Sequence, residues 1–251
     1  MSFAFDRTAG FVLTELLVAG LIAAVLMLGL VQMAAATSRG LQLVESLSET
    51  QQGGRFAFDQ MRDAVMAAGF DPAPWEGSVA SGGLSANSAE GGLGESDTLT
   101  LRLLSDRNCY GNFNPLLDAY GRPEFFLRES TFERTAAGNL AHSCYYGPAG
   151  GVPVRQINRE GLVQNVESFQ VLYAEDRDGD LRAERRVRAG QWEDVGQVLG
   201  VQLGLLLASA EAVGDEVTTP LTVLDETVIP PADGRLRRVW TTTVAIGSKL
   251  R

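Results

Sequence analysis

The side chains of this chain that could do chemistry are few, and they lie far apart in the sequence. A single carboxylate, Glu15, stands inside an otherwise apolar stretch that runs over residues 11–36. A second place is the acidic run formed by Asp176, Asp178 and Asp180. An isolated charge among apolar residues and a row of alternating carboxylates call for different partners. The first needs a cation that neutralises it, and the second could hold a metal ion.

The acidic run has two open interpretations, a Ca²⁺ site and a solvated turn. Alternating carboxylates beside a glycine suit a hard cation such as Ca²⁺, which takes about 6–8 oxygen ligands. The EF-hand pattern fits poorly when Asp176, Asp178 and Asp180 are its first three ligands. Leu181 then stands where the turn glycine belongs, and Val187 where the bidentate glutamate belongs. Glu184 could contribute if the loop folds back.

No catalytic pattern emerges elsewhere, so we expect no enzyme activity. The chain has neither a Gly-x-Ser-x-Gly elbow nor a phosphate-binding loop. Its one histidine, His142, lies in an expected strand, where a surface position is far commoner than a catalytic one. Five aromatic residues surround the cysteines and indicate either a contact surface or core packing: Tyr110, Phe113, Tyr120, Tyr145 and Tyr146.

The apolar stretch 11–36 is long enough to cross a membrane. As a helix it would extend about 39 Å, and a span needs about 20 residues. An acidic residue at mid-membrane costs roughly 2.5–3.5 kcal/mol on insertion scales, so Glu15 calls for compensation. A secretory signal has its small-residue cleavage site after the apolar core, whereas Ala9 and Gly10 precede it here. Cleavage there would leave the apolar helix on the mature protein.

Gly10, Phe11 and Glu15, with apolar residues between them, resemble the class III signal of type IV prepilins and pseudopilins. The resemblance implies that a prepilin peptidase cuts between Gly10 and Phe11 and methylates the new amino terminus. It also implies that Glu15 pairs with the terminal amine of a neighbouring subunit, which makes a buried carboxylate tolerable. Many major pilins have a proline where this chain has Gln32, which argues against a major subunit. A signal anchor with a chance glutamate is the alternative.

The composition is that of an acidic, exported protein. The net charge of −10 and a pI near 4.7 argue against direct nucleic-acid binding, which needs a basic surface. Cys109 and Cys144 both follow the apolar stretch, and an even count in an oxidising compartment predicts a disulfide. A loop of this length makes the bridge worth about 3.5–4 kcal/mol in the chain-entropy model. Two buried free thiols are the alternative.

The elements that must position these residues are one long helix and several strands. Phe58, Met61 and Val65 keep helical spacing, so the helix should continue to Gly69, with a bend plausible at the glycine pair 53–54. Residues 71–96 have the composition of a loop. Alternating apolar residues predict strands at 97–104, 124–135, 140–146, 163–173, 200–207 and 237–246, and 192–198 suits a short helix. This order indicates an α+β fold with an antiparallel sheet.

Three later segments resemble PilW-type minor pilins, namely 54–70, the acidic run and 237–244. The resemblance implies a pilin-like fold, with a long amino-terminal helix packed on an antiparallel β-sheet domain. The expected division is a leader at 1–10, a transmembrane or filament helix at 11–36, its amphipathic continuation at 37–70, and a β-rich periplasmic or extracellular domain at 71–251.

The function implied is that of a minor pilin that helps to initiate and build type IV pili, for motility or adhesion. Expected partners are other minor and major pilins, the prepilin peptidase, the inner-membrane assembly platform and the inner membrane itself. The protein would lie in the inner membrane with its β-domain periplasmic, and then in the pilus at the cell surface. Two alternatives stay open. One is a large minor pseudopilin of a type II secretion system, and the other is a pilus-tip module for adhesion or Ca²⁺ binding.

Overall fold

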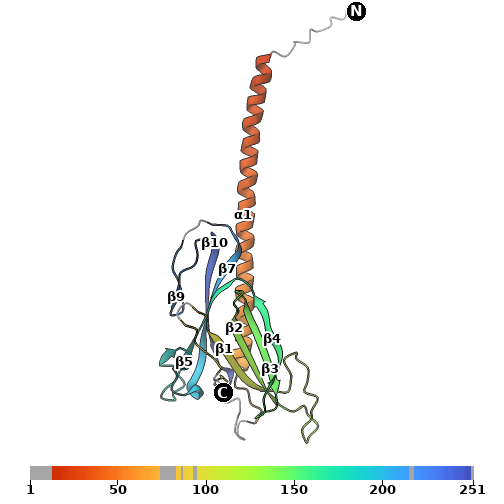
Figure 1. The fold of residues 1–251 in the computed structure, drawn as a ribbon, viewed down its shortest axis with the longest axis vertical. Helices are drawn as coiled ribbons and strands as arrows, with labels where there is room; N and C mark the ends of the chain where they lie inside the picture. Colours follow the sequence, from red (N-terminus) through yellow and green to blue (C-terminus); the bar gives the residue numbers. More distant parts are fainter. Residues whose placement is uncertain (1–12, 74–82, 86, 93–94, 215–217, 250–251) are drawn as a thin grey trace, which may run out of the picture. The chain divides into compact units, whose positions relative to one another are not determined.

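The computed structural model describes residues 13–73, 83–85, 87–92, 95–214 and 218–249. The chain divides into two compact units, Met1–Glu45 and Ser46–Arg251. Helix α1 (Leu13–Ala67) contributes to both, and the strands all belong to the second unit (Figure 1). The predicted long amino-terminal helix is therefore confirmed, although it ends two residues earlier than Gly69.

The part of α1 inside the second unit buries one narrow face. Its buried residues recur every three or four positions, as a single helical face requires: Ser46, Thr50, Gly54, Ala57, Met61 and Val65. Most are small, so the strands can approach the helix axis closely. No bend is needed at the glycine pair, because α1 runs unbroken through Gly53 and Gly54. A Cβ atom built on Gly54 would lie 2.6 Å from Cε2 of Trp240, so close approach explains this glycine.

Two four-stranded antiparallel sheets and one small hairpin make up the rest of the unit. The first sheet is a meander in the order β1 (Thr98–Ser105), β2 (Phe126–Arg134), β3 (Leu140–Gly147) and β4 (Val154–Val163). The second has the order β10 (Arg235–Ala245), β7 (Val198–Ala212), β5 (Val166–Glu175) and β6 (Arg185–Val187). Strands β8 (Leu221–Val223) and β9 (Glu226–Val228) pair with each other.

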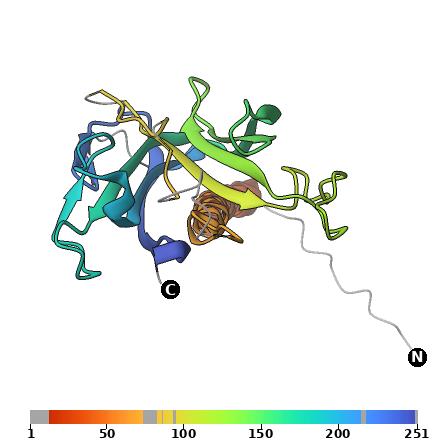
Figure 2. The same ribbon diagram turned by 90° about the horizontal axis from the view of Figure 1, so that it is seen from below.

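One hydrophobic core joins α1 to both sheets. It contains Met61 and Val65 of the helix, Leu99 and Leu101 of β1, and Phe169 of β5, together with residues of β2, β3, β7 and β10. Figure 2 shows the helix end-on beside the two sheets. The predicted architecture, a helix packed on antiparallel sheet, is confirmed, and the single expected sheet is in fact two.

The sequence analysis differs from the structure at several elements. Residues 163–173 are not one strand, because β4 ends at Val163 and β5 begins at Val166. Asn165 turns the chain there with a left-handed backbone (φ 58°), which a short polar side chain tolerates. The helix expected at 192–198 is only a 3₁₀ turn, Val195–Gln197. Strands β4, β6, β8 and β9 were not predicted, and neither was the final 3₁₀ turn Gly247–Lys249.

Candidate functional site

The amino-terminal unit presents an apolar helix with a carboxylate at its start. Glu15 lies in the first turn of α1, where the helix dipole favours a negative charge. The large apolar side chains from Leu13 to Met33 are 54–76 % exposed. The helix is long and apolar enough to cross a membrane. Gly10 and Phe11, the expected processing residues, lie outside the described residues.

That much exposed apolar surface must be covered by lipid or by other protein segments. Soluble monomers rarely expose contiguous apolar patches larger than a few hundred Å². Both a bilayer and a bundle of similar helices would provide a medium of low dielectric constant. In either medium a carboxylate is tolerated when a cation or hydrogen-bond donors compensate for it. The helix therefore carries an apolar surface for insertion and one acidic group, Glu15, that can select a cationic neighbour.

The predicted disulfide between Cys109 and Cys144 is confirmed, with an S–S distance of 2.02 Å. It attaches the connection between β1 and β2 to the middle of β3. The backbone N–H of Cys109 also donates to Oε1 of Gln156 in β4 (2.9 Å), and the Tyr110 hydroxyl donates to the Gln156 carbonyl. The bridge and these bonds hold a long loop rigidly against the edge of the first sheet.

The aromatic residues around the bridge divide between surface and core. Tyr110, Phe113 and Tyr120 are exposed on the loop that the disulfide attaches. Tyr146 is buried, and its hydroxyl donates to the Ser105 carbonyl at 3.1 Å. Core packing therefore accounts for Tyr146, and Tyr145 is half-buried. The three loop aromatics are accessible, so a contact surface there stays a prediction.

The acidic run forms the turn between β5 and β6, and it brings four carboxylates together. Ligand oxygens of Asp176, Asp178, Asp180 and Glu184 all lie within 4.8 Å of one another. Glu184 does fold back, because its Oε2 accepts from the Arg177 backbone N–H at 2.7 Å. Asp176 is buried and the other three are exposed. Four oxygen donors of this kind suit Ca²⁺.

The backbone of the turn resolves one objection to a cation site. Leu181 occupies the position that should be glycine, yet it adopts the left-handed conformation (φ 67°) that the glycine would supply. The Asp176 carboxylate accepts from the N–H groups of Gly179 (2.7 Å) and Leu181 (2.9 Å), which holds the turn closed. The sequence could not show this, since leucine rarely takes a positive φ. Val187 remains a mismatch, because it is buried in β6.

The base of the turn is anchored by a buried ion pair. The Glu175 carboxylate is fully buried and lies 2.7 Å from Nε of Arg185. Burial alone would raise the pKa of Glu175, but hydrogen bonds from Arg185 and from the Glu193 backbone hold the pKa below its usual value. Glu175 thus stays charged and fixes β6 on β5, so that Asp176 and Glu184 face each other across the turn.

His142 lies on β3 facing α1 rather than on the free surface. Its ring stacks on Phe132 with centroids 5.0 Å apart, and desolvation lowers its pKa, although the charge of Glu160 opposes this. Arg128 and Asp63 line the same small cavity, about 240 Å³. The expected surface position holds only in part, because His142 is half-buried. A neutral, stacked imidazole serves packing between the sheet and the helix.

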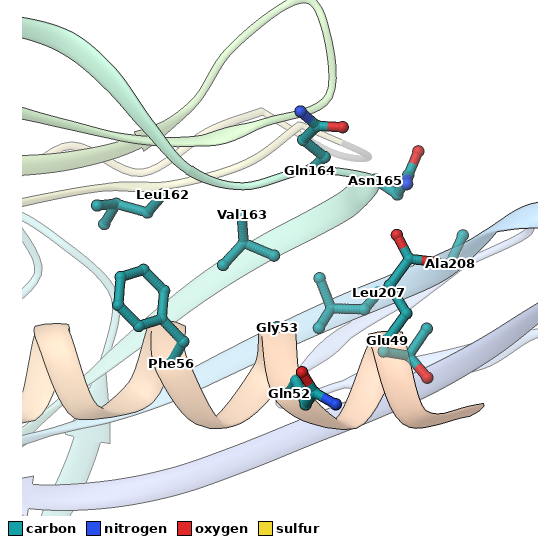
Figure 3. A pocket seen from close by; sticks show the side chains of 11 residues that line it. Glu49, Gln52, Gly53, Phe56, Leu162, Val163, Gln164, Asn165, Leu207 and Ala208 are labelled. Atoms are coloured by element: carbon teal, nitrogen blue, oxygen red, sulfur yellow. The ribbon is translucent and has the colours of Figure 1, made fainter. Parts of the chain in front are cut away.

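A more apolar groove of about 350 Å³ lies where α1 passes the turn between β4 and β5. Figure 3 shows Glu49 and Phe56 extending from the helix toward Val163 and Leu207, with Asn165 at the opposite rim. The groove has an aliphatic and aromatic floor and a polar rim. Sequence analysis did not find it, because its walls come from three segments more than 40 residues apart.

Comparison with known proteins gives a match to a family model and matches to four chains of solved structures. A solved type IV-like pilin from Thermus thermophilus matches with 19 % identity and a TM-score of 0.47, over 83 % of this chain and 97 % of that one. None of the curated proteins matches the chain. Residues 149–248, from just before β4 into the final 3₁₀ turn, match the family described as type IV pilus-assembly protein W. Over this region the chain is similar to that family.

Proposed function

We propose that this protein is a minor pilin of the PilW type, processed after Gly10 and packed into the pilus or its tip complex through its amino-terminal helix. The observation that carries the proposal is the acidic Glu15 in the first turn of α1, at the start of its exposed apolar segment. Cleavage before Phe11 would create a terminal amine four residues from Glu15. That amine, on a neighbouring subunit, is a suitable cation for the carboxylate.

The proposed sequence of events follows from solvation. Before assembly the apolar helix lies in the inner membrane, with the β-domain in the periplasm, where the disulfide forms. During assembly the helix moves from lipid into a bundle of pilin helices, and the Glu15 carboxylate exchanges its compensating partners for the amine of the next subunit. Other minor and major pilins, the prepilin peptidase and the inner-membrane platform are the partners that this path requires.

The test is the mass and amino-terminal sequence of the protein from cells with and without prepilin peptidase. The proposal expects a mature form that begins at methylated Phe11 and disappears without the peptidase. Glu15→Gln should then abolish piliation while the protein is still processed, whereas Glu45→Gln, an exposed glutamate further along α1, should not. A protein that keeps residues 1–10, or is cleaved beyond Ala36, would contradict the proposal.

A pseudopilin of a type II secretion system would give the same processing result, so a second readout separates the two. Deletion of the gene should remove surface pili and leave protein secretion intact if the pilus role is right. Loss of secretion with normal piliation would favour the secretion system.

A second function, Ca²⁺ binding by the turn 176–184, is favoured by the convergence of its four carboxylates within 4.8 Å. We propose that the turn holds Ca²⁺ through Asp176, Asp178, Asp180 and Glu184. Titration of the full-length protein in detergent with Ca²⁺ should give saturable heat that Asp178→Asn abolishes and that Mg²⁺ does not reproduce. Asp118→Asn, in an exposed acidic turn elsewhere, is the control. Equal heats for Asp178→Asn and the unsubstituted protein would show that the turn is only solvated.

A further inference from the structure

A cleft of about 430 Å³ lies where three turns of the second unit meet. Its walls are the turn between β2 and β3, Asn165 between β4 and β5, and the segment that links β9 to β10. Arg134 and Arg235 line it from two sides, and Pro230 and Pro231 close a third. The volume is within the range of about 300–1,000 Å³ that small-molecule sites occupy.

The carboxylates next to this cleft are already committed to a different arginine. Arg237 holds Glu167 through two parallel bonds, Nε to Oε2 at 2.8 Å and Nη2 to Oε1 at 2.9 Å. It also donates to both oxygens of Asp233, at 2.8 and 2.9 Å. This network leaves Glu167 and Asp233 little capacity for a second guanidinium.

Arg134 and Arg235 therefore lack a carboxylate partner among the described residues. Nε of Arg134 donates to the Val166 carbonyl at 2.6 Å, and Nε of Arg235 donates to the Ser209 carbonyl. Nη2 of Arg235 is buried without a hydrogen-bond partner in the described part of the chain. A buried donor left unpaired is unfavourable, and more so when it is charged.

The local charge is opposite to that of the whole protein. Arg134, Arg235 and Arg237 face two carboxylates, although the chain as a whole carries a net charge of −10. Glu167 also lines the cleft, but its carboxylate is bonded to Arg237. An acceptor entering the cleft would thus meet two guanidinium groups that hold no carboxylate.

We propose that this cleft binds a small oxyanion, a phosphate- or carboxylate-bearing molecule, between Arg134 and Arg235. The Nε edge of each guanidinium is fixed by a backbone carbonyl, so the remaining N–H groups are held ready for an anion. Guanidinium groups pair with phosphate and carboxylate oxygens through charge-assisted hydrogen bonds, often two at a time. The binding site is preorganised, because both arginines are anchored before the ligand arrives.

The experiment uses the full-length protein in detergent, titrated with inorganic phosphate in one arm and glutarate in the other, at constant ionic strength. At least one of the two should bind saturably, and Arg134→Gln should weaken that binding at least tenfold. Arg134→Lys keeps the positive charge but removes the paired N–H donors of the guanidinium. The affinity of this variant should therefore fall between those of Arg134→Gln and the unsubstituted protein. Arg155→Gln, which removes an exposed arginine of β4 outside the cleft, should leave it unchanged.

The two arms identify which oxyanion the cleft prefers, and chloride at the same ionic strength measures non-specific screening. Thermal unfolding without added anion confirms that each variant is folded. Saturable binding that is unchanged by Arg134→Gln and by Arg235→Gln would overturn the proposal. So would a loss of affinity in Arg155→Gln as large as the loss in Arg134→Gln. Titrations that show no saturation with either anion would overturn it as well.

Discussion

Gly54 gives the sharpest test of how the helix and the second sheet fit together. A Cβ atom added there would lie 2.6 Å from Cε2 and 2.8 Å from Nε1 of Trp240, well inside van der Waals contact. The indole cannot move freely, because Phe58 packs 6.5 Å from it and the Arg238 guanidinium covers its ring at 4.6 Å. Gly54→Ala must therefore displace the ring and disturb both contacts.

The magnitude follows from two opposing effects. Overpacking of this kind costs about 1–3 kcal/mol, and weakening the Arg238 contact adds roughly 0.5–1 kcal/mol. Alanine in place of glycine inside a helix stabilises the folded state by about 1 kcal/mol, which opposes these costs. We expect Gly54→Ala to lower the free energy of unfolding by about 0.5–3 kcal/mol. Gly53→Ala is the matched control, because its Cβ would meet only Cγ1 of Val163, at 3.1 Å, a contact that a shift of a few tenths of an ångström relieves.

The assay is chemical unfolding of the full-length protein in detergent, followed by tryptophan fluorescence and circular dichroism. Gly53→Ala should be as stable as the unsubstituted chain or slightly more so. Combining Gly54→Ala with Trp240→Leu should make the two changes non-additive by about 1 kcal/mol or more, because the smaller side chain removes the clash. Equal stability of the two glycine variants would refute the argument from close approach.

Two further predictions concern the bridge and the histidine. Replacing Cys109 and Cys144 by serine opens a loop with a sequence separation of 35, so the free energy of unfolding should fall by about 4 kcal/mol and the thermal midpoint by roughly 8–16 °C. An unchanged midpoint by calorimetry would contradict this. Desolvation holds the pKa of His142 below its ordinary 6.5, so the unfolded chain takes up the proton more readily and stability falls as pH decreases below about 7. His142→Gln should lessen that decrease in stability curves measured between pH 7.5 and 5.5, and parallel curves would contradict the prediction.

Regular periodicity made much of the fold predictable. The spacing of Met61 and Val65 predicted the buried face of the helix. The alternating leucines predicted β1 to within one residue at each end, since the expected strand was 97–104 and the observed one is Thr98–Ser105. The disulfide followed from an even cysteine count. The break between β4 and β5 was missed, because Gln164 and Asn165 interrupt an apolar run without a glycine or proline. Strands β8 and β9 have three residues each, too few for any periodicity to appear.

The candidate sites were predictable only where their residues are neighbours in the sequence. Asp176, Asp178 and Asp180 form one segment, so the sequence named them, although it could not show that Leu181 takes a left-handed conformation. Arg134 and Arg235 lie about 100 residues apart and meet through the pairing of different strands.

Charge balance in the cleft also depends on which arginine takes which carboxylate, and this cannot be read from composition. Arg237 and Arg235 are two residues apart on β10, yet a bulge between them directs their side chains to different partners. Arg237 binds Glu167 and Asp233, and the side-chain hydrogen bonds from Arg237 are the main reason that the pKa of Asp233 falls to about 2. Arg235 is left with a backbone carbonyl. The irregular pairing of β10 with β7 thus gives the two arginines different surroundings. Arg237 has two carboxylate partners, whereas Arg235 lacks an anionic partner among the described residues.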